Sequence, residues 1–181
     1  DTTKQRACDI SDFKLTDNPF EVTDDPQIDI IVELMGGEST AREVALRALE
    51  HDKHIVTANK ALIAVHGNDI FDVAMKKGLV VAFEAAVAGG ISIIKVLREG
   101  LTGNRIERVI GIVNGTTNFI LSEMHKKGSP FSKVLAEAQR LGYAESDPSF
   151  DIEGIDAAHK LTILSSIAFG IPLDFDSVYV E

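Results

Sequence analysis

Short β-branched runs alternate with segments of helical periodicity over the first half of the chain, and this alternation limits the possible folds more than any other feature. Buried strands are predicted at residues 28–34 (IDIIVEL), 54–59 (HIVTAN) and 79–87 (LVVAFEAAV). Apolar residues at helical spacing predict one helix over residues 39–51 and another over residues 68–78, opened by Asn68 or Asp69. This order predicts parallel strands joined by right-handed crossovers, the doubly wound α/β arrangement that binds nucleotides at the carboxyl ends of its strands.

The nucleotide-binding unit predicted in this way lacks its usual beginning. The chain opens with polar residues instead of a strand, and its sequence contains no G-x-G-x-x-G turn. The main cradle for a pyrophosphate is therefore missing. We expect the chain to be an internal fragment that holds the later part of a partial doubly wound, Rossmann-like unit, and we expect this fragment to be inactive by itself.

The order of predicted elements changes after the glycine pair at residues 89 and 90. The second half is predicted to contain a helix over 91–100, a strand over 105–115, a helix capped by Thr116 or Thr117 and ending near Lys127, a helix opened by Ser129 and Pro130 and ending at Gly142, an acidic loop over 143–155, and a helix over 154–170. This mixture predicts an α+β domain after the nucleotide unit. We place the boundary near Glu84, which gives domains at 1–83 and 84–181.

Composition excludes several classes of function. The chain has 28 acidic residues against 18 lysines and arginines, a net charge of -10, so no nucleic-acid partner is expected. The most apolar run, residues 79–94, is interrupted by Glu84 and two glycines and is too short to span a bilayer, so no membrane partner is expected. Cys8 is the single cysteine, which excludes an intrachain disulfide and favours a reducing, cytoplasmic location.

The clearest candidate for chemistry is the helix predicted over residues 154–170, which follows a loop rich in carboxylates. In this helix Lys160 lies in line with Asp156 and with the apolar Ile163 and Leu164. Burial and the helix dipole disfavour an ammonium at this position, whereas Asp156 favours it, and the sequence does not decide which effect is larger. A lysine in such surroundings is suited to release and recover a proton. A solvated acidic loop followed by an ordinary surface ion pair is the alternative.

Other short elements carry weaker signals. Lys60 follows a predicted strand at the edge where doubly wound sheets bind ligands, although a lysine at the start of a helix is usually solvated. Asn114 fits a turn and a helix cap. Glu84 lies near glycines whose backbone carbonyls could bind a hard cation, although an interdomain hinge explains these glycines equally well. His159 is expected on the helix surface or in packing, not as a metal ligand.

Taken together and in this order, four segments resemble the homoserine dehydrogenase family: VTANKALIA, FEAAVAGGISIIK, GIVNGTTNFIL and EAQRLGYAESDPSFDIEGIDAAHKLTILSSIAFG. The resemblance covers nearly the whole chain. It implies the reversible reduction of L-aspartate 4-semialdehyde to L-homoserine with NADPH or NADH, on the route to threonine, methionine and isoleucine. Two alternatives stay open: a dehydrogenase of another amino acid semialdehyde, and a non-catalytic dimerising or metabolite-binding module.

The resemblance also implies roles for individual residues. Lys160 is similar to the family's catalytic proton donor, and Asp156 to the aspartate that accompanies it. The implied substrate contacts are Glu145, Asp151 and Lys60; the implied cofactor contacts are Lys60, Met35, Gly36 and Asn114; and a structural sodium ion would be held by Glu84 and the carbonyls of Val87, Gly89 and Ile91. The resemblance further implies a homodimer, paired largely through the sheet of the second domain.

Overall fold

The predicted strands form one parallel sheet in the computed structural model, which describes residues 6–180. The strands are β1 (Ile30–Glu33), β2 (His54–Thr57) and β3 (Val81–Ala82), in the order β1-β2-β3. Ile31 pairs with Ile55 and Ile55 with Val81, so these three buried side chains share one face of the sheet. The predicted α/β class, with a parallel sheet in its nucleotide unit, is confirmed.

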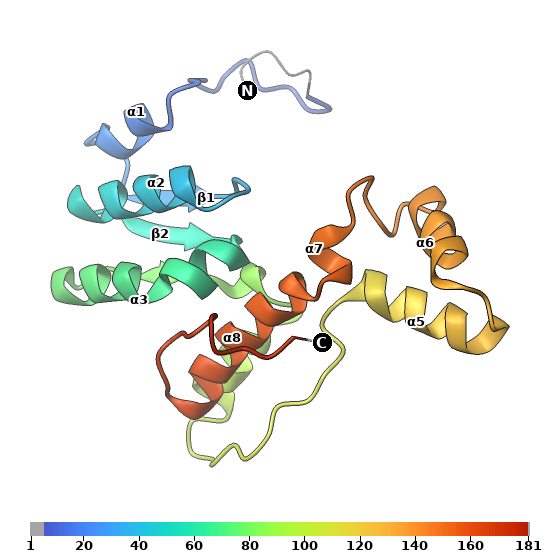
Figure 1. The fold of residues 1–181 in the computed structure, drawn as a ribbon. Helices are drawn as coiled ribbons and strands as arrows, with labels where there is room; N and C mark the ends of the chain where they lie inside the picture. The colour runs from blue at the N-terminus through green and yellow to red at the C-terminus, as the bar shows by residue number, and fades with distance from the viewer. Residues whose placement is uncertain (1–5, 181) are drawn as a thin grey trace.

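Helices cover that face of the sheet. α2 (Ser39–Glu50) and α3 (Lys60–Lys77) pack against each other and share a hydrophobic core with the strands, and α1 (Pro19–Asp24) packs on α2 (Figure 1). The opposite face carries Ile30, Val32 and Val56, which are 54%, 60% and 40% exposed. β1 thus carries apolar residues on both faces, a pattern typical of strands buried between two layers of helices. Among the described residues, helices cover only one of these faces.

The predicted start of α3 is wrong by eight residues. The helix begins at Lys60 instead of Asn68 or Asp69, because the side-chain oxygen of Asn59 accepts the Leu62 N–H at 3.0 Å and caps the first turn. The strand that was predicted to reach Asn59 accordingly ends at Thr57.

Gly67 and Asn68 bring α3 against the C-terminal segment. A Cβ atom at Gly67 would lie 2.4 Å from Leu173 Cδ1, so the glycine permits close packing within the helix. The Asn68 side chain donates to the Leu173 carbonyl at 2.9 Å and accepts the Leu173 N–H at 3.1 Å. These residues therefore join distant parts of the chain and do not open a helix.

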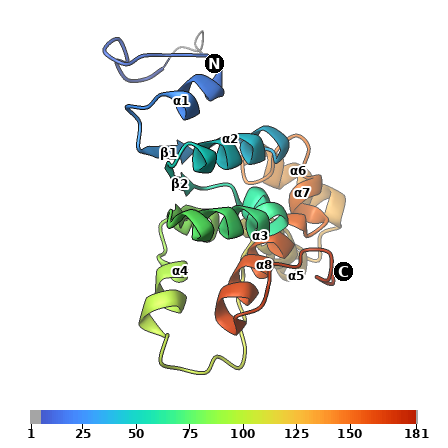
Figure 2. The same ribbon diagram turned by 90° about the vertical axis from the view of Figure 1, so that its left-hand side faces the viewer.

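After β3 the backbone is tightly coiled before it becomes helical again. Of the predicted 79–87 strand, only β3 pairs with β2. Glu84–Ala86, toward its end, form a 3-10 turn instead. The predicted 91–100 helix begins two residues late as α4 (Ile93–Lys95) and widens into a π-helical turn (Val96–Gly100). Figure 2 shows this stretch running beside α8 (Ile155–Phe169).

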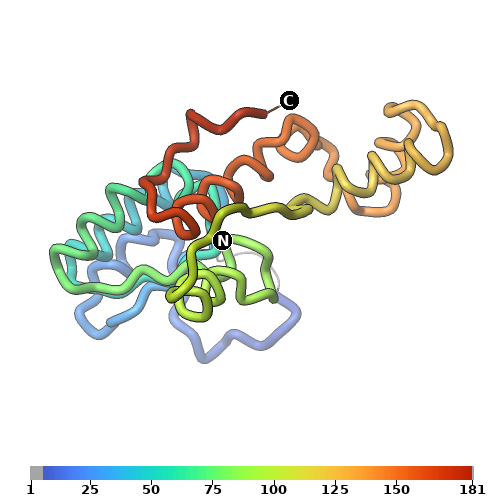
Figure 3. Tube along the Cα trace, turned by 90° about the horizontal axis from the view of Figure 1, so that it is seen from below, coloured from blue at the N-terminus to red at the C-terminus, as the bar shows by residue number. Residues whose placement is uncertain are grey.

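The strand predicted over residues 105–115 is wrong. Residues 105–113 have no assigned strand or helix and run as an extended connection toward α5 (Figure 3). Ile110 and Ile112 are 81% and 79% exposed. The alternating sequence produces extended backbone, but no described strand lies alongside to complete a ladder of hydrogen bonds.

The remaining helices are α5 (Gly115–Lys127), α6 (Phe131–Arg140) and α7 (Ser149–Ile152), followed by α8. Asn114 caps α5, in place of the predicted Thr116 or Thr117, because its side-chain oxygen accepts the Thr117 N–H at 2.8 Å. Pro130 is the residue before α6 instead of its first residue. α7 forms inside the segment predicted to be an acidic loop.

Two hydrophobic clusters stabilise these helices. Ile163 and Leu164 of α8 belong to the same core as the sheet, α2 and α3. A smaller cluster, built around Ile120 and Val134, holds α5 and α6 together away from the sheet (Figure 1). Within residues 6–180, no helix has the length and hydropathy needed to cross a membrane.

Candidate active site

Polar side chains from four separate segments meet at the start of α8. Lys60 is the first residue of α3, Asn114 immediately precedes α5, and Asp151 lies on α7. Asp156 and Lys160 stand one turn apart on α8 and share a face. The fold therefore gathers residues from both halves of the chain into one cluster.

The Asp156 carboxylate is the centre of this cluster. Its Oδ2 accepts hydrogen bonds from Lys160 Nζ at 2.6 Å and from Asn114 Nδ2 at 2.8 Å. Its Oδ1 lies 3.1 Å from Lys60 Nζ. The side chain is only 8% exposed, so each oxygen that has lost water has gained a donor from the protein.

Two opposing effects set the pKa of Asp156. Burial raises this pKa, but the hydrogen bonds from Lys160, Asn114 and Lys60 together outweigh burial, and the pKa lies below its ordinary value of 3.8. The carboxylate is therefore ionised at neutral pH. It places a negative charge between two ammonium groups.

Lys160 is held by two acceptors inside the protein. Its Nζ donates to Asp156 Oδ2 and to the backbone carbonyl of Val113, both at 2.6 Å, and its side chain is 19% exposed. An ammonium has three N–H donors, so one remains for a further partner. This environment differs from that of an exposed surface ion pair. A lysine is accommodated on this face of α8 because two acceptors inside the protein bind its ammonium group.

Lys60 reaches the same carboxylate from the half of the chain that holds the parallel sheet. Its side chain is 30% exposed, and its Nζ lies 5.4 Å from the centroid of the Phe150 ring, within the range of a cation–π contact. The sequence indicated Lys60 only by its position after a strand. Its pairing with Asp156, 96 positions later, depends on the packing of α3 against α8.

Asn114 has two functions in the structure. Besides capping α5, its Nδ2 donates to Asp151 Oδ1 at 2.7 Å and to Asp156 Oδ2. The turn and cap prediction is confirmed, but no local pattern could reveal carboxylate partners 37 and 42 residues away.

The other predicted contacts lie in different surroundings. Met35 and Gly36 lie in the loop after β1, at the carboxyl edge of the sheet. Lys60, which follows β2, starts α3 at the same edge. Glu145 is exposed, and within the described residues no hydrogen bond or ion pair links its carboxylate to the cluster. The structure thus brings Lys60, Asn114 and Asp151 to the Asp156–Lys160 pair but does not bring Glu145 into contact with it.

Known proteins match both halves of the chain. Residues 1–84 match the family profile described as the NAD binding domain of homoserine dehydrogenase, and residues 93–181 match the profile described as homoserine dehydrogenase. The chain belongs to the homoserine dehydrogenase family. The homoserine dehydrogenase of Pseudomonas aeruginosa is 64% identical over 174 residues, which are 96% of this chain and 40% of that protein.

Solved structures of homoserine dehydrogenases share the fold. The crystal structure of the enzyme from Thiobacillus denitrificans has a TM-score of 0.89 and 67% identity, covering 92% of this chain and 38% of that one. A hyperthermophilic archaeal homoserine dehydrogenase in complex with NADPH has a TM-score of 0.82 and 34% identity, covering 94% of this chain and 55% of that one. The chain spans about 40% of the length of the curated relatives that it matches.

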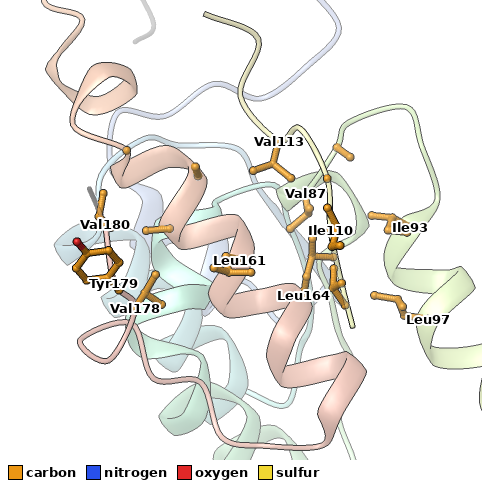
Figure 4. A pocket seen from close by; sticks show the side chains of 16 residues that line it. Val87, Ile93, Leu97, Ile110, Val113, Leu161, Leu164, Val178, Tyr179 and Val180 are labelled. Carbon is orange, nitrogen blue, oxygen red and sulfur yellow. The ribbon is translucent and has the colours of Figure 1, made fainter. Parts of the chain in front are cut away.

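An apolar cavity of about 650 Å³ (Figure 4) has Val113 and Leu161 in its lining and therefore lies beside the cluster. Leu161 and Leu164 of α8, Ile110 of the extended segment and Val180 near the C-terminus are among its lining residues. None of the lining side chains carries a charge, so the cavity is unsuited to an amino acid with its ammonium and carboxylate groups. The polar cluster is therefore the candidate active site.

Glu84 lies apart from this cluster and caps α4. Its two carboxylate oxygens accept the backbone N–H groups of Ile94 at 3.0 Å and Lys95 at 2.9 Å. Among residues 6–180, no group of three or more His, Cys, Asp or Glu side chains is arranged to hold a metal ion. A cation at the predicted segment would therefore depend on backbone carbonyls together with Glu84.

His159 is a buried neighbour of the site that the sequence did not mark as important. The residue is 2% exposed, and its ring makes tilted contacts with the rings of Phe150, at a centroid distance of 5.4 Å, and Phe175, at 4.4 Å. Its Nδ1 has no hydrogen-bond partner within the described residues. Burial lowers the pKa of His159 below its ordinary value of 6.5; Glu38 and Asp156 act against this and Lys60 with it.

His159 should make the stability of the protein sensitive to acid. The unfolded chain binds a proton at His159 near pH 6.5, whereas the folded chain binds it only at lower pH, so between these values the unfolded state holds more protons. Stability should therefore fall as pH decreases from 6.5 toward the lowered pKa, and His159→Gln should reduce that fall. Urea midpoints measured from about pH 8 to about pH 5 will check this.

His125→Gln provides the matched control because His125 is exposed on α5. This variant should keep the full acid-induced fall in stability. An equally steep fall in wild type and His159→Gln would contradict the assignment to the buried ring.

Proposed function

We propose that the full-length protein, meaning a protein of the relatives' length that contains this segment, interconverts L-aspartate 4-semialdehyde and L-homoserine with NADPH or NADH. The observation that carries the proposal is the partly buried Lys160 ammonium, fixed by Asp156 and the Val113 carbonyl with one N–H left over. Family membership and the relative solved with NADPH support it. The reaction would serve threonine, methionine and isoleucine synthesis in the cytoplasm.

Reduction of the aldehyde needs a proton at oxygen as well as a hydride at carbon. The nicotinamide cofactor supplies the hydride when it is bound. The π electrons of the carbonyl group move to its oxygen, and this oxygen takes a proton from Lys160 Nζ. In the oxidative direction the neutral Lys160 amine accepts the hydroxyl proton of homoserine.

Asp156 would act by orienting this proton donor. Because Asp156 and Val113 occupy two of the three N–H donors of Lys160, the third has a defined direction toward the substrate oxygen. Lys60 binds the other oxygen of Asp156 and would stand near the nicotinamide and the substrate. Met35 and Gly36, at the same edge of the sheet, and Asn114 complete the proposed cofactor contacts.

The acidic residues near the site would bind the amino acid end of the substrate. Oδ1 of Asp151 accepts the Asn114 amide, and we propose that its second oxygen binds the substrate's ammonium group. Glu145 lies on the same acidic stretch and is exposed, so we propose it as a second partner for that ammonium.

Substitution of Lys160 tests the proposed function. In the full-length protein, Lys160→Ala should lower kcat by about 10² to 10⁴, the usual contribution of general acid–base catalysis, because the substitution removes the proposed proton donor. The dissociation constant for NADPH, measured by calorimetry, should stay close to that of the wild type.

Lys133→Ala is the matched control, since Lys133 is an exposed lysine on α6 away from the cluster. It should turn over homoserine at the wild-type rate. Near-normal turnover by Lys160→Ala would refute the catalytic assignment.

We also propose a structural sodium ion held by Glu84 and the carbonyls of Val87, Gly89 and Ile91. Each carboxylate oxygen of Glu84 keeps a second lone pair beyond its bond to α4. Ala88, within this segment, has φ of 51°, a strained value for a residue with a side chain, which a bound ion would help to maintain. The residues present are compatible with a monovalent cation.

Sodium should therefore stabilise the full-length protein beyond the effect of ionic strength. Sodium chloride should raise the melting temperature more than choline chloride does, because only sodium binds the oxygen ligands. Glu84→Gln should remove most of this difference. Equal melting temperatures in the two salts would count against the ion.

We further propose that the full-length protein is a homodimer in which the extended segment 105–113 takes part. Ile110 and Ile112 are exposed, and their backbone has no ladder partner among residues 6–180. Both observations support the proposal, since such a segment can pair with another strand. Light scattering should give twice the monomer mass, and Ile112→Lys should shift it toward the monomer. Met75→Lys, at a 73% exposed position on α3, should remain dimeric, and a monomeric wild type would exclude the proposal.

A further inference from the structure

A buried hydrogen-bond network joins the carboxyl ends of β1 and β2 and has no part in the proton transfer described above. Glu33 and Thr57 are the last residues of these strands, and they are 2% and 1% exposed. The Thr57 hydroxyl donates to Glu33 Oε2 at 2.5 Å and accepts the Asn59 N–H at 3.0 Å. The two strand ends are thus tied together by side chains as well as by the sheet.

This network holds the loop that follows β1. The other oxygen of Glu33 accepts the Met35 N–H at 2.6 Å. The Asn59 amide donates to the carbonyls of Met35 at 3.3 Å and Gly37 at 2.6 Å. Backbone groups on both sides of Gly36 are therefore fixed from inside the protein, while the Met35 side chain stays 36% exposed at the edge of the sheet.

Stability alone is a poor explanation for these residues. A carboxylate buried without a cation costs free energy that hydrogen bonds only partly recover, and an apolar residue at the same site is often at least as stabilising. Glu33 has no ion pair within the described residues, and its neighbours Ile31 and Ile55 in the sheet are apolar. What Glu33 provides, and an apolar residue would not, is an acceptor for the loop backbone.

We propose that Glu33 and Thr57 are positioning residues for the nicotinamide cofactor: they hold residues 34–37 in the shape that receives it. This inference rests on the proposed function, because it takes that loop to be part of the cofactor site. Thr57 orients the Glu33 carboxylate through its hydroxyl, Glu33 holds the Met35 N–H, and neither residue needs to touch the cofactor. The loop is then shaped before binding, which lowers the ordering cost of binding.

Thr57→Val and Thr57→Ser form the test, because valine keeps the shape of threonine without the hydroxyl and serine keeps the hydroxyl. In the substrate-free full-length protein, Thr57→Val removes both hydrogen bonds of the hydroxyl. It should raise the calorimetric dissociation constant for NADPH about five- to tenfold, and Thr57→Ser should restore it. Hydrogen exchange at the Met35 amide without cofactor should be faster in Thr57→Val and near normal in Thr57→Ser. Turnover at saturating cofactor should change little.

Thr23→Val is the matched control. Thr23 is fully buried, and its hydroxyl donates to the Phe20 carbonyl at 3.0 Å in α1, away from the loop. This variant should lower the melting temperature without changing NADPH affinity. A Thr57→Val protein that loses stability as Thr23→Val does, but binds NADPH like the wild type, would overturn the inference. A wild type that binds NADPH but does not oxidise homoserine would overturn the proposed function alone.

Discussion

The geometry of the site depends on the pairing of one buried carboxylate. An isolated carboxylate that is 8% exposed would cost several kcal/mol. Asp156 avoids that cost because Lys60, Lys160 and Asn114 all donate to it. These donors come from the start of α3, from α8 and from the residue before α5. By binding all three, the carboxylate also fixes the relative positions of these segments.

The charges of the cluster suit a substrate that is itself a zwitterion. Lys60 and Lys160 supply two formal positive charges, and Asp151 and Asp156 supply two negative charges. An amino acid with one charge of each sign can enter such a site without leaving an excess of either. The neighbouring cavity, lined by uncharged side chains, offers no such balance.

Local sequence patterns were sufficient where neighbours along the chain decide the structure. The β1–α2 unit and the Asp156–Lys160 pair follow from strand composition and helical spacing. The start of α3 was missed although its signal, the Asn59 cap, is local. The predicted opening residue, Asn68, instead binds Leu173, more than a hundred residues away. The role of Asn114 was underestimated because its carboxylate partners are distant in sequence.

One acceptor for Lys160 is a backbone carbonyl, that of Val113. Every amino acid has a backbone carbonyl, so a substitution at residue 113 can keep this hydrogen bond to Lys160. The hydrogen bond is instead sensitive to the course of the main chain through residues 105–113. Insertions and deletions in that connection, more than substitutions, are the changes that evolution would have to avoid.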